Sequence, residues 1–173
     1  HMMFSVQLNY IRRLLGTAIA FASFGAGGAA MGLLFPLVNQ VTPVAQRQPR
    51  ARRAIHWVFI VFLRMMRALG IMDWRVEGVE RLGRTGQLVI ANHPSLLDVV
   101  FMMAHIAEPN CVVKGALFRN PFTRGPVTAA GFIPNDNSEV MLTLGAQALV
   151  SGDCLIMFPE GTRTTPGVEM SFH

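Results

Sequence analysis

The hydrophobic and polar positions divide the chain into two unlike parts. From Leu14 to Gln46 no charged residue occurs, and the apolar run from Leu14 to Val38 is long enough, at about 1.5 Å per helical residue, to cross a bilayer core of about 30 Å. A second apolar stretch, Ala54 to Met72, carries Arg64 and Arg67 on one edge. Its apolar residues recur at helical spacing: Trp57, Ile60, Val61, Met65, Ala68 and Leu69. We expect two helices here, the second of them amphipathic and interfacial.

Beyond Asp73 short apolar runs alternate with helical ones, which is typical of an α/β fold. Strands are predicted at 88–91, 111–113, 132–133 and 154–158, and helices at 94–106 and 138–150, the latter capped by Ser138 and ended by Gly152. The sequence therefore predicts an α/β domain over residues 73–173, a partly parallel sheet with flanking helices. Residues 1–72 form a basic, apolar membrane-anchoring segment before it.

Composition strengthens the membrane interpretation. The 173 residues are 51% hydrophobic and only 14% charged, with a mean hydropathy of +0.40. Charged residues make up about 25% of ordinary globular domains. These figures exclude a disordered or collagen-like chain and favour a membrane-associated protein.

The charges are distributed unevenly along the chain. Residues 1–72 contain eight arginines and no acidic residue, whereas the remainder contains seven basic and ten acidic residues. These arginines flank apolar stretches and no nucleic-acid motif is present, so anionic membrane lipid, rather than nucleic acid, is the expected partner.

Arginines stand on both sides of the first apolar run, whereas a single crossing normally shows an asymmetry of positive charge. They are Arg12, Arg13, Arg47, Arg50, Arg52 and Arg53. We therefore favour a helical hairpin that dips into one leaflet with both flanks cytosolic. A true span, and a buried helical half of a soluble protein, stay open as alternatives.

The two cysteines predict little chemistry. Cys111 and Cys154 each begin an apolar run, without a CxxC motif or a histidine at metal-ligand spacing. We expect buried free thiols in reducing, cytosolic surroundings.

A first polar cluster, Asn92 to Asp98, directly follows a predicted strand. Pro94 suits the first position of a helix, which leaves His93 just outside it and able to fold back toward Asp98. A carboxylate on one imidazole nitrogen fixes the tautomer and makes the other nitrogen an effective general base. A purely structural His–Asp hydrogen bond is the alternative. No GxSxG elbow surrounds Ser95, so a helix-cap role suffices for it.

A second cluster, Phe158 to Thr164, follows the last predicted strand. Its Pro-Glu-Gly turn would present backbone N–H groups, and Arg163 offers a planar fork suited to phosphate or carboxylate. Ligand chemistry in α/β sheets gathers at the carboxyl ends of the strands, where both clusters are expected.

Together these clusters resemble the motifs of the glycerolipid acyltransferase family, specifically the bacterial lysophospholipid or 1-acylglycerol-3-phosphate acyltransferases. The first motif, Asn-His, four residues and Asp, is matched by Asn92, His93 and Asp98, and the third, Phe-Pro-Glu-Gly-Thr-Arg, by residues 158–163. The resemblance covers roughly residues 76–164. It also includes Lys114, Leu117, Pro121 and Gly125, followed by Gly131, Phe132 and Ile133.

The resemblance implies direct acyl transfer without an acyl-enzyme. His93, oriented by Asp98, would take the proton from an acceptor hydroxyl as it attacks the thioester of acyl-CoA or acyl carrier protein. The residues expected to bind substrate are Asn92, Lys114, Arg119, Arg124, Glu160, Gly161, Thr162 and Arg163. Among them, Arg163 would hold the acceptor's phosphate. No metal and no cofactor besides the acyl donor is implied.

This sequence departs from the family at two places. Asn137 stands where the second motif usually has an arginine that is thought to contact phosphate. Either Lys114, Arg119 or Arg124 would supply the missing charge, or the acceptor is not a simple phosphomonoester. The chain also ends at His173, before the family's fourth motif, so we expect a C-terminally incomplete domain.

The expected protein is therefore a phospholipid-biosynthetic acyltransferase on the inner (cytoplasmic) membrane, with its active site facing the cytosol. Two alternatives stay open: the same chemistry on a non-phospholipid acceptor such as a specialised lipid or polyene product, and a non-catalytic monotopic membrane-binding module.

Overall fold

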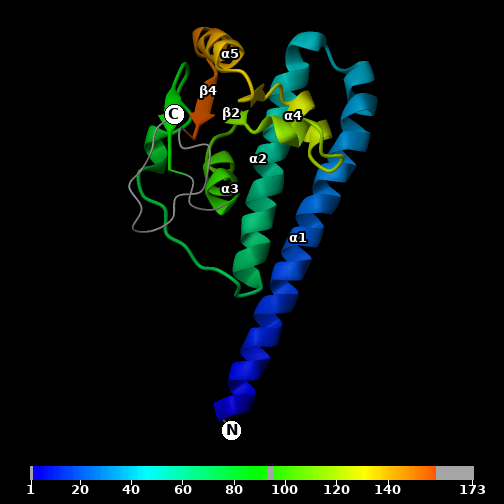
Figure 1. Ribbon diagram of the computed structural model, residues 1–173, viewed down its shortest axis with the longest axis vertical. Coiled ribbons are helices and arrows are strands. Elements are labelled where there is room, and N and C mark those ends of the chain that lie inside the picture. The colour runs from blue at the N-terminus through cyan, green and yellow to red at the C-terminus, as the bar shows by residue number, and fades with distance from the viewer. Residues whose placement is uncertain (1, 93–95, 159–173) are drawn as a thin grey trace.

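The computed structural model describes residues 2–92 and 96–158, and in it two long helices lie beside a small α/β unit (Figure 1). In chain order the elements are α1 (Met2–Val41), α2 (Val44–Ala68), the 3-10 turn η1 (Val79–Arg81), β1 (Leu88–Ile90), α3 (Leu96–Ala104), β2 (Pro109–Val113), the 3-10 turn η2 (Gly115–Phe118), α4 (Arg124–Ala129), β3 (Ile133–Pro134), α5 (Ser138–Val150) and β4 (Cys154–Met157). Each strand and helix predicted beyond residue 73 is present, with bounds within two residues of those expected.

The four strands form one parallel sheet in the order β1-β4-β2-β3. β4 is the last described strand in sequence, yet it lies between β1 and β2 in the sheet. Ile156 of β4 is opposite Val89 of β1 on one side and Cys111 of β2 on the other. The prediction of an α/β fold with a parallel sheet and flanking helices is confirmed.

Side chains alternate between the two faces of the sheet, as the pleat requires. Cys111 and Ile156 are buried in the main core, which α2 and α3 cover. Val112 and Leu155 point to the other face and pack beneath α5. Covered on both faces, the strands consist of nearly continuous apolar residues.

The first two helices form an antiparallel hairpin joined by a turn at residues 42–43 (Figure 1). Phe24 of α1 stacks on Phe59 of α2, with ring centroids 5.7 Å apart. At the turn, Thr42 donates its hydroxyl to the Val38 carbonyl, and Arg47 donates to the Thr42 carbonyl. Two helices were expected here, but the favoured hairpin had the two arginine groups as its flanks, whereas the first apolar run forms one unbroken helix between them. α2 also begins earlier than predicted, so the arginines from position 47 onward lie in its first turns rather than in a linker.

Two glycines lie where α1 meets the turn before α4. A Cβ at Gly28 would overlap the carbonyl oxygen of Phe122, and one at Gly125 would overlap the backbone of Gly32. The turn before α4 therefore lies directly on the α1 backbone, an approach that only glycine permits.

α2 is apolar on two sides rather than one. On its buried side, Ala51, Ile55, Phe59 and Leu63 pack into the main core, and Met66 is also buried. Trp57 and Val61, which the sequence placed on the apolar face, are instead 59% and 61% exposed. The helix also ends at Ala68, before the expected Met72. Besides the apolar residues that were predicted to face lipid, α2 therefore carries a second apolar set, which the α/β unit buries.

Two arginines expected to face lipid are instead paired with acids of the α/β unit. Arg52 is buried, donates to the Ala130 carbonyl at 2.8 Å and pairs with Asp153 at 2.8 Å. Buried Asn110 donates to the same carboxylate at 2.9 Å. Arg53 pairs with Glu108 near the surface. Asp153 and Asn110 lie where β4 and β2 begin, so this network closes the amino-terminal edge of the sheet.

One helix of the described residues is long and apolar enough to cross a membrane by length and composition, over Leu14–Val41 with a mean hydropathy of 1.7. Only 6% of its most apolar window is buried inside the structure. Most of this apolar segment of α1 is therefore exposed in the structure.

We predict that Arg52→Ala destabilises the fold by about 3 kcal/mol, because it leaves buried partners of the network unpaired. In thermal unfolding in detergent, this corresponds to a melting temperature lower by roughly 6–12 °C for a chain of this size. Arg53→Ala is the matched control, since an exposed pair contributes only about 0–1 kcal/mol. Equal shifts for the two variants would contradict the network's assigned role.

Candidate active site

The carboxyl ends of all four strands meet at one edge of the sheet. There the Ala91 amide donates to the Met157 carbonyl at 3.1 Å, which continues the pairing of β1 and β4 beyond Ile90. The segments that carry the two predicted motifs, residues 92–98 and 158–163, thus leave from neighbouring strands. His93, Glu160, Gly161, Thr162 and Arg163 lie outside the described residues.

Two residues of the first motif are described. Asn92 is exposed just after β1, and Asp98 is half-buried in the first turn of α3. A carboxylate in the first turn is stabilised by the positive end of the helix dipole. The acid expected to orient His93 is therefore held by a packed helix.

Lys114 directly follows β2 and is exposed at the same edge, one strand away from β4. It precedes Gly115, at which a Cβ would collide with the Asp136 carboxylate. Asp136 follows β3, and its Oδ2 lies 3.7 Å from Nη1 of Arg119. The ends of β2 and β3 thus bring Lys114, Arg119 and Asp136 into one neighbourhood.

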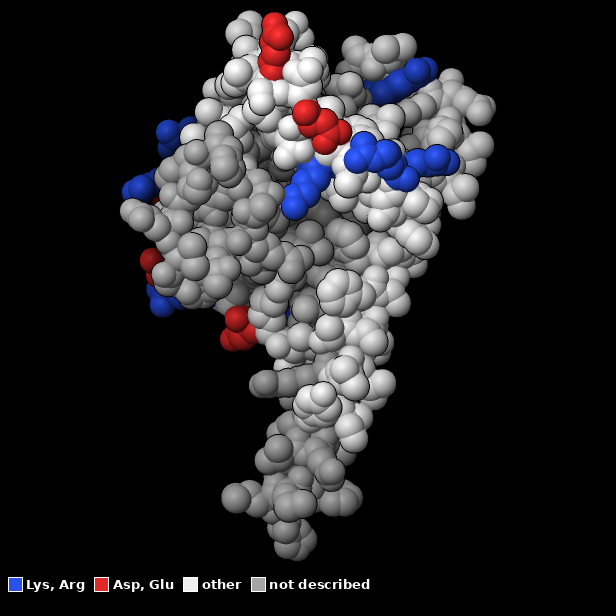
Figure 2. All heavy atoms as spheres, in the orientation of Figure 1, with Lys and Arg blue, Asp and Glu red and all other residues white. Residues whose placement is uncertain are grey.

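Arg124 lies apart from that pair, at the start of α4. Its backbone N–H donates to the Asn120 carbonyl at 2.8 Å, while its exposed side chain makes no ion pair with another described residue. Figure 2 shows basic side chains gathered over the α4 region beside an acidic one. Among the predicted cations, Lys114 and Arg119 belong to the sheet edge, and Arg124 belongs to the turn that contacts α1.

Asn137, which replaces the expected arginine, has a structural function. Its side-chain oxygen accepts a hydrogen bond from the Val140 amide at 3.0 Å, so it is the N-cap of α5. The prediction that Ser138 caps this helix is wrong by one residue, because Ser138 already lies within it. Both residue types are favourable N-caps, so the sequence alone could not separate them.

The cysteines match the prediction of buried free thiols. Burial raises the pKa of Cys111 to about 12, and burial also raises the pKa of Cys154. Neither is a thiolate near neutral pH. Within the described residues, no group of His, Cys, Asp or Glu could hold a metal ion.

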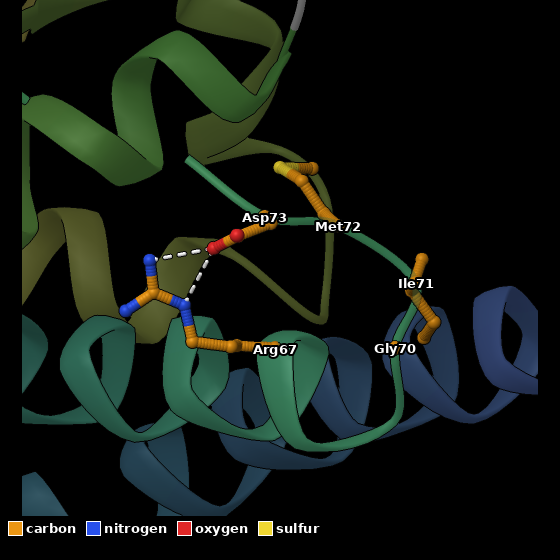
Figure 3. A pocket seen from close by; sticks show the side chains of 5 residues that line it. All are labelled: Arg67, Gly70, Ile71, Met72 and Asp73. Atoms are coloured by element: carbon orange, nitrogen blue, oxygen red, sulfur yellow. Dashed lines mark hydrogen bonds and ion pairs between the residues drawn. The ribbon is translucent and has the colours of Figure 1, made fainter. Parts of the chain in front are cut away.

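A surface pocket of about 560 Å³ lies where α2 ends, lined by Arg67, Gly70, Ile71, Met72 and Asp73 (Figure 3). The Arg67 guanidinium points at the Asp73 carboxylate at 2.7 Å, and its hydrogen bond lowers the pKa of Asp73. Arg67 also lies 4.4 Å from the ring centre of Trp74, which packs on Phe101 of α3. This hollow belongs to the link between α2 and the α/β unit.

Sequence reasoning missed Asp136 and the glycine contacts of α1. Asp136 carried a weak signal, an acid beside the unexpected Asn137. The contacts of Gly28 and Gly32 were missed because no pattern along the chain shows that a distant turn lies against them.

The acyltransferase family model matches residues 73–173 of this chain, which is more than half of it. The chain belongs to the acyltransferase family.

A curated relative supports this membership. The chain is 30% identical over 166 residues to a 1-acyl-sn-glycerol-3-phosphate acyltransferase of Saccharomyces cerevisiae, a match that covers 91% of this chain and 50% of the relative. The chain therefore spans about half the length of the curated relative it matches.

The fold has a solved counterpart. The crystal structure of the 1-acyl-sn-glycerophosphate (LPA) acyltransferase PlsC from Thermotoga maritima superposes with a TM-score of 0.71 at 23% identity, covering 94% of this chain and 66% of that one. The likeness shows that the two share a fold.

We predict that Asn137→Ala destabilises the protein by about 1 kcal/mol, the usual cost of losing an N-cap, because the Val140 amide loses its partner. Ser138→Ala, one residue later, should change the free energy of unfolding by less than about 0.5 kcal/mol. Denaturant unfolding of both variants in the same detergent measures the difference. The opposite ranking would restore Ser138 as the cap.

Proposed function

We propose that this protein transfers a fatty acyl group from acyl-CoA or acyl carrier protein to the free hydroxyl of a lysophospholipid of lysophosphatidic acid type, in phospholipid biosynthesis. The observation that carries the proposal is the parallel pairing of β1 with β4, the two strands that directly precede the His-Asp and Glu-Gly-Thr-Arg segments in the sequence. Membership of the acyltransferase family and the name of the yeast relative support it.

The proposed step needs one general base. His93 takes the proton of the acceptor hydroxyl while the oxygen attacks the thioester carbonyl carbon. Asp98 keeps the imidazole in the productive tautomer and stabilises its protonated form. When the tetrahedral intermediate collapses, the carbon–sulfur bond breaks and the thiolate takes up the proton. The products are a diacyl lipid and a free thiol, and no metal or redox cofactor enters the balance.

The proposed acceptor site requires positive charge for the phosphate. Lys114 at the end of β2 and Arg119 beside Asp136 are exposed at the sheet edge. Arg163 of the third motif, which lies outside the described residues, is proposed as a further phosphate ligand. Because Asn137 is used as a helix cap, its lack of charge does not by itself favour a phosphate-free acceptor.

The proposed setting is the cytosolic face of the inner membrane, with the α1–α2 hairpin in one leaflet. α1 exposes a charge-free apolar stripe that includes Leu15, Ile19, Leu33 and Leu37. On α2 Trp57 and Arg64 are both exposed and lie two helical turns apart on the same side, and both residue types are favoured in helices at the membrane interface. This placement lets a one-tailed lipid reach the sheet edge without leaving the bilayer.

His93→Ala should lower acyl transfer by about 10²–10⁴-fold, the usual contribution of a general base. Free-thiol release from acyl-CoA or acyl carrier protein, in the presence of lysophosphatidate, measures the rate. Ser95→Ala is the matched control and should retain turnover, because the mechanism gives Ser95 no proton to move. Unchanged turnover in the His93 variant would rule out the mechanism, whereas loss in the Ser95 variant alone would indicate a serine nucleophile.

Lys114→Gln should lower kcat/KM for lysophosphatidate by about 10–100-fold, because a hydrogen bond to a charged group contributes about 1.5–3 kcal/mol. With a monoacylglycerol acceptor, which has no phosphate, the same variant should match the parent protein. Arg84→Gln, an exposed cation in the loop before β1, is the control. If the parent ignores lysophosphatidate but acylates another hydroxyl lipid, detected by mass spectrometry, the phospholipid assignment fails and acyl transfer stands.

A further inference from the structure

The turn at residues 119–124, between η2 and α4, lies against the α1 backbone and presents an exposed aromatic ring between two arginines. Phe122 is 56% exposed, and its carbonyl oxygen lies where a side chain at Gly28 would have to be. Arg119 and Arg124 are exposed on either side of it in the sequence. The reaction proposed above uses neither Phe122 nor Arg124.

The apolar surface of α1 continues into this turn. Leu14 and Phe21 are 59% and 66% exposed, and they precede Gly28 at steps of two helical turns. All three positions therefore lie on the same side of α1. The 119–124 turn covers this side of α1 at Gly28, and the turn carries the exposed apolar side chain of Phe122.

The turn is ordered by its own hydrogen bonds. The Asn120 side-chain oxygen accepts from the Phe122 amide at 2.9 Å, and its carbonyl accepts from the amides of Thr123 and Arg124. The Thr123 hydroxyl donates to the Leu117 carbonyl at 2.7 Å. A turn held in this way loses little conformational freedom when it binds a partner.

We propose that the 119–124 turn is a second membrane-contact element, in which Phe122 enters the interface of the bilayer and Arg119 and Arg124 bind anionic lipid headgroups. Aromatic rings are favoured at the depth of the lipid headgroups, and arginines beside them are attracted to anionic lipids. The position of the turn against the exposed apolar helix α1 favours lipid over an acidic protein, because a bilayer can contact α1 and the turn at the same time. Asp136, 3.7 Å from Arg119, is the acid of the sheet edge that an anionic headgroup would displace.

The contact has a consequence for the sheet edge. The same segment that reaches the membrane runs back through η2 to Lys114, and Gly115 beneath it packs on Asp136. Docking of the turn would hold the carboxyl edge of the sheet at headgroup depth, where a lipid phosphate resides. The inference rests on the membrane attachment proposed above, but not on acyl transfer.

The test uses a tryptophan placed at the turn by Phe122→Trp, in the full chain with Trp57→Phe and Trp74→Phe to remove other emission. Vesicles of phosphatidylcholine and phosphatidylglycerol with brominated acyl chains quench tryptophan that enters the bilayer. Two reference positions have comparable exposure: Leu33→Trp on α1 should be quenched, and Leu142→Trp on α5 should not. We expect quenching at position 122 at least threefold stronger than at position 142.

Arg119→Gln with Arg124→Gln should weaken the docking of the turn by about tenfold or more, since each arginine near an anionic surface contributes roughly 1 kcal/mol. The readout is the fraction of anionic lipid required for half-maximal quenching at position 122. Arg81→Gln with Arg84→Gln, two exposed cations on the other side of the α/β unit, is the charge-matched control.

Strong quenching at position 33 together with quenching at position 122 no greater than at position 142 would overturn the proposal, because the protein would then be bound through α1 alone. A blue shift at position 122 caused by acyl carrier protein without vesicles, and no lipid quenching, would assign the turn to the carrier instead. Intact quenching in a chain that transfers no acyl group would count against the proposed reaction and leave the membrane contact standing.

Discussion

The pairing of β4 with β1 on one side and β2 on the other is the constraint on which the rest of the structure depends. β1 and β4 are separated by some sixty residues of chain, yet the register that sets Ile90 opposite Met157 places the two motif-bearing segments at adjacent strand ends. β4 also pairs with β2, so Lys114, which directly follows β2, lies at the same edge of the sheet. Because parallel strands require crossovers, α3 and α5 follow from this order and cover opposite faces of the sheet.

The long N-terminal helices are part of this fold rather than an appendage to it. α2 contributes Ile55, Phe59 and Leu63 to the same core as Ile156, and its Arg52 closes the amino edge of the sheet opposite the motifs. α1 in turn supports the turn before α4 through Gly28 and Gly32. The surface that faces solvent or lipid is therefore oriented relative to the carboxyl edge by packed contacts on both helices.

Much of the α/β unit was predictable because local patterns specify it. Buried parallel strands are short, continuous apolar runs, and the helices at 96–104 and 138–150 follow recognisable start and stop signals, so these six elements were predicted within two residues, whereas η2 and α4 were not predicted. The buried face of α2 could not be predicted in this way, since two of its sides are apolar and only the position of the α/β unit decides which one is buried. Its arginines illustrate the same limit: an exposed Arg64 and a buried Arg52 are identical in a charge count, and they differ because Asp153 lies opposite one of them.

For the candidate site, the sequence indicated which residues take part, and the structure showed which of the segments that carry them are neighbours. The Asn-His and Glu-Gly-Thr-Arg runs, and the resemblance they carry, are properties of the chain read in order, because the chemistry requires those side chains at those spacings. That the strands before them are neighbours, that Asn137 is a helix cap and that Asp136 accompanies Arg119 were decided only by tertiary structure. The physical reason is that hydrophobic periodicity records how each segment is buried, whereas strand order and the partner of a charge depend on segments far apart in the sequence.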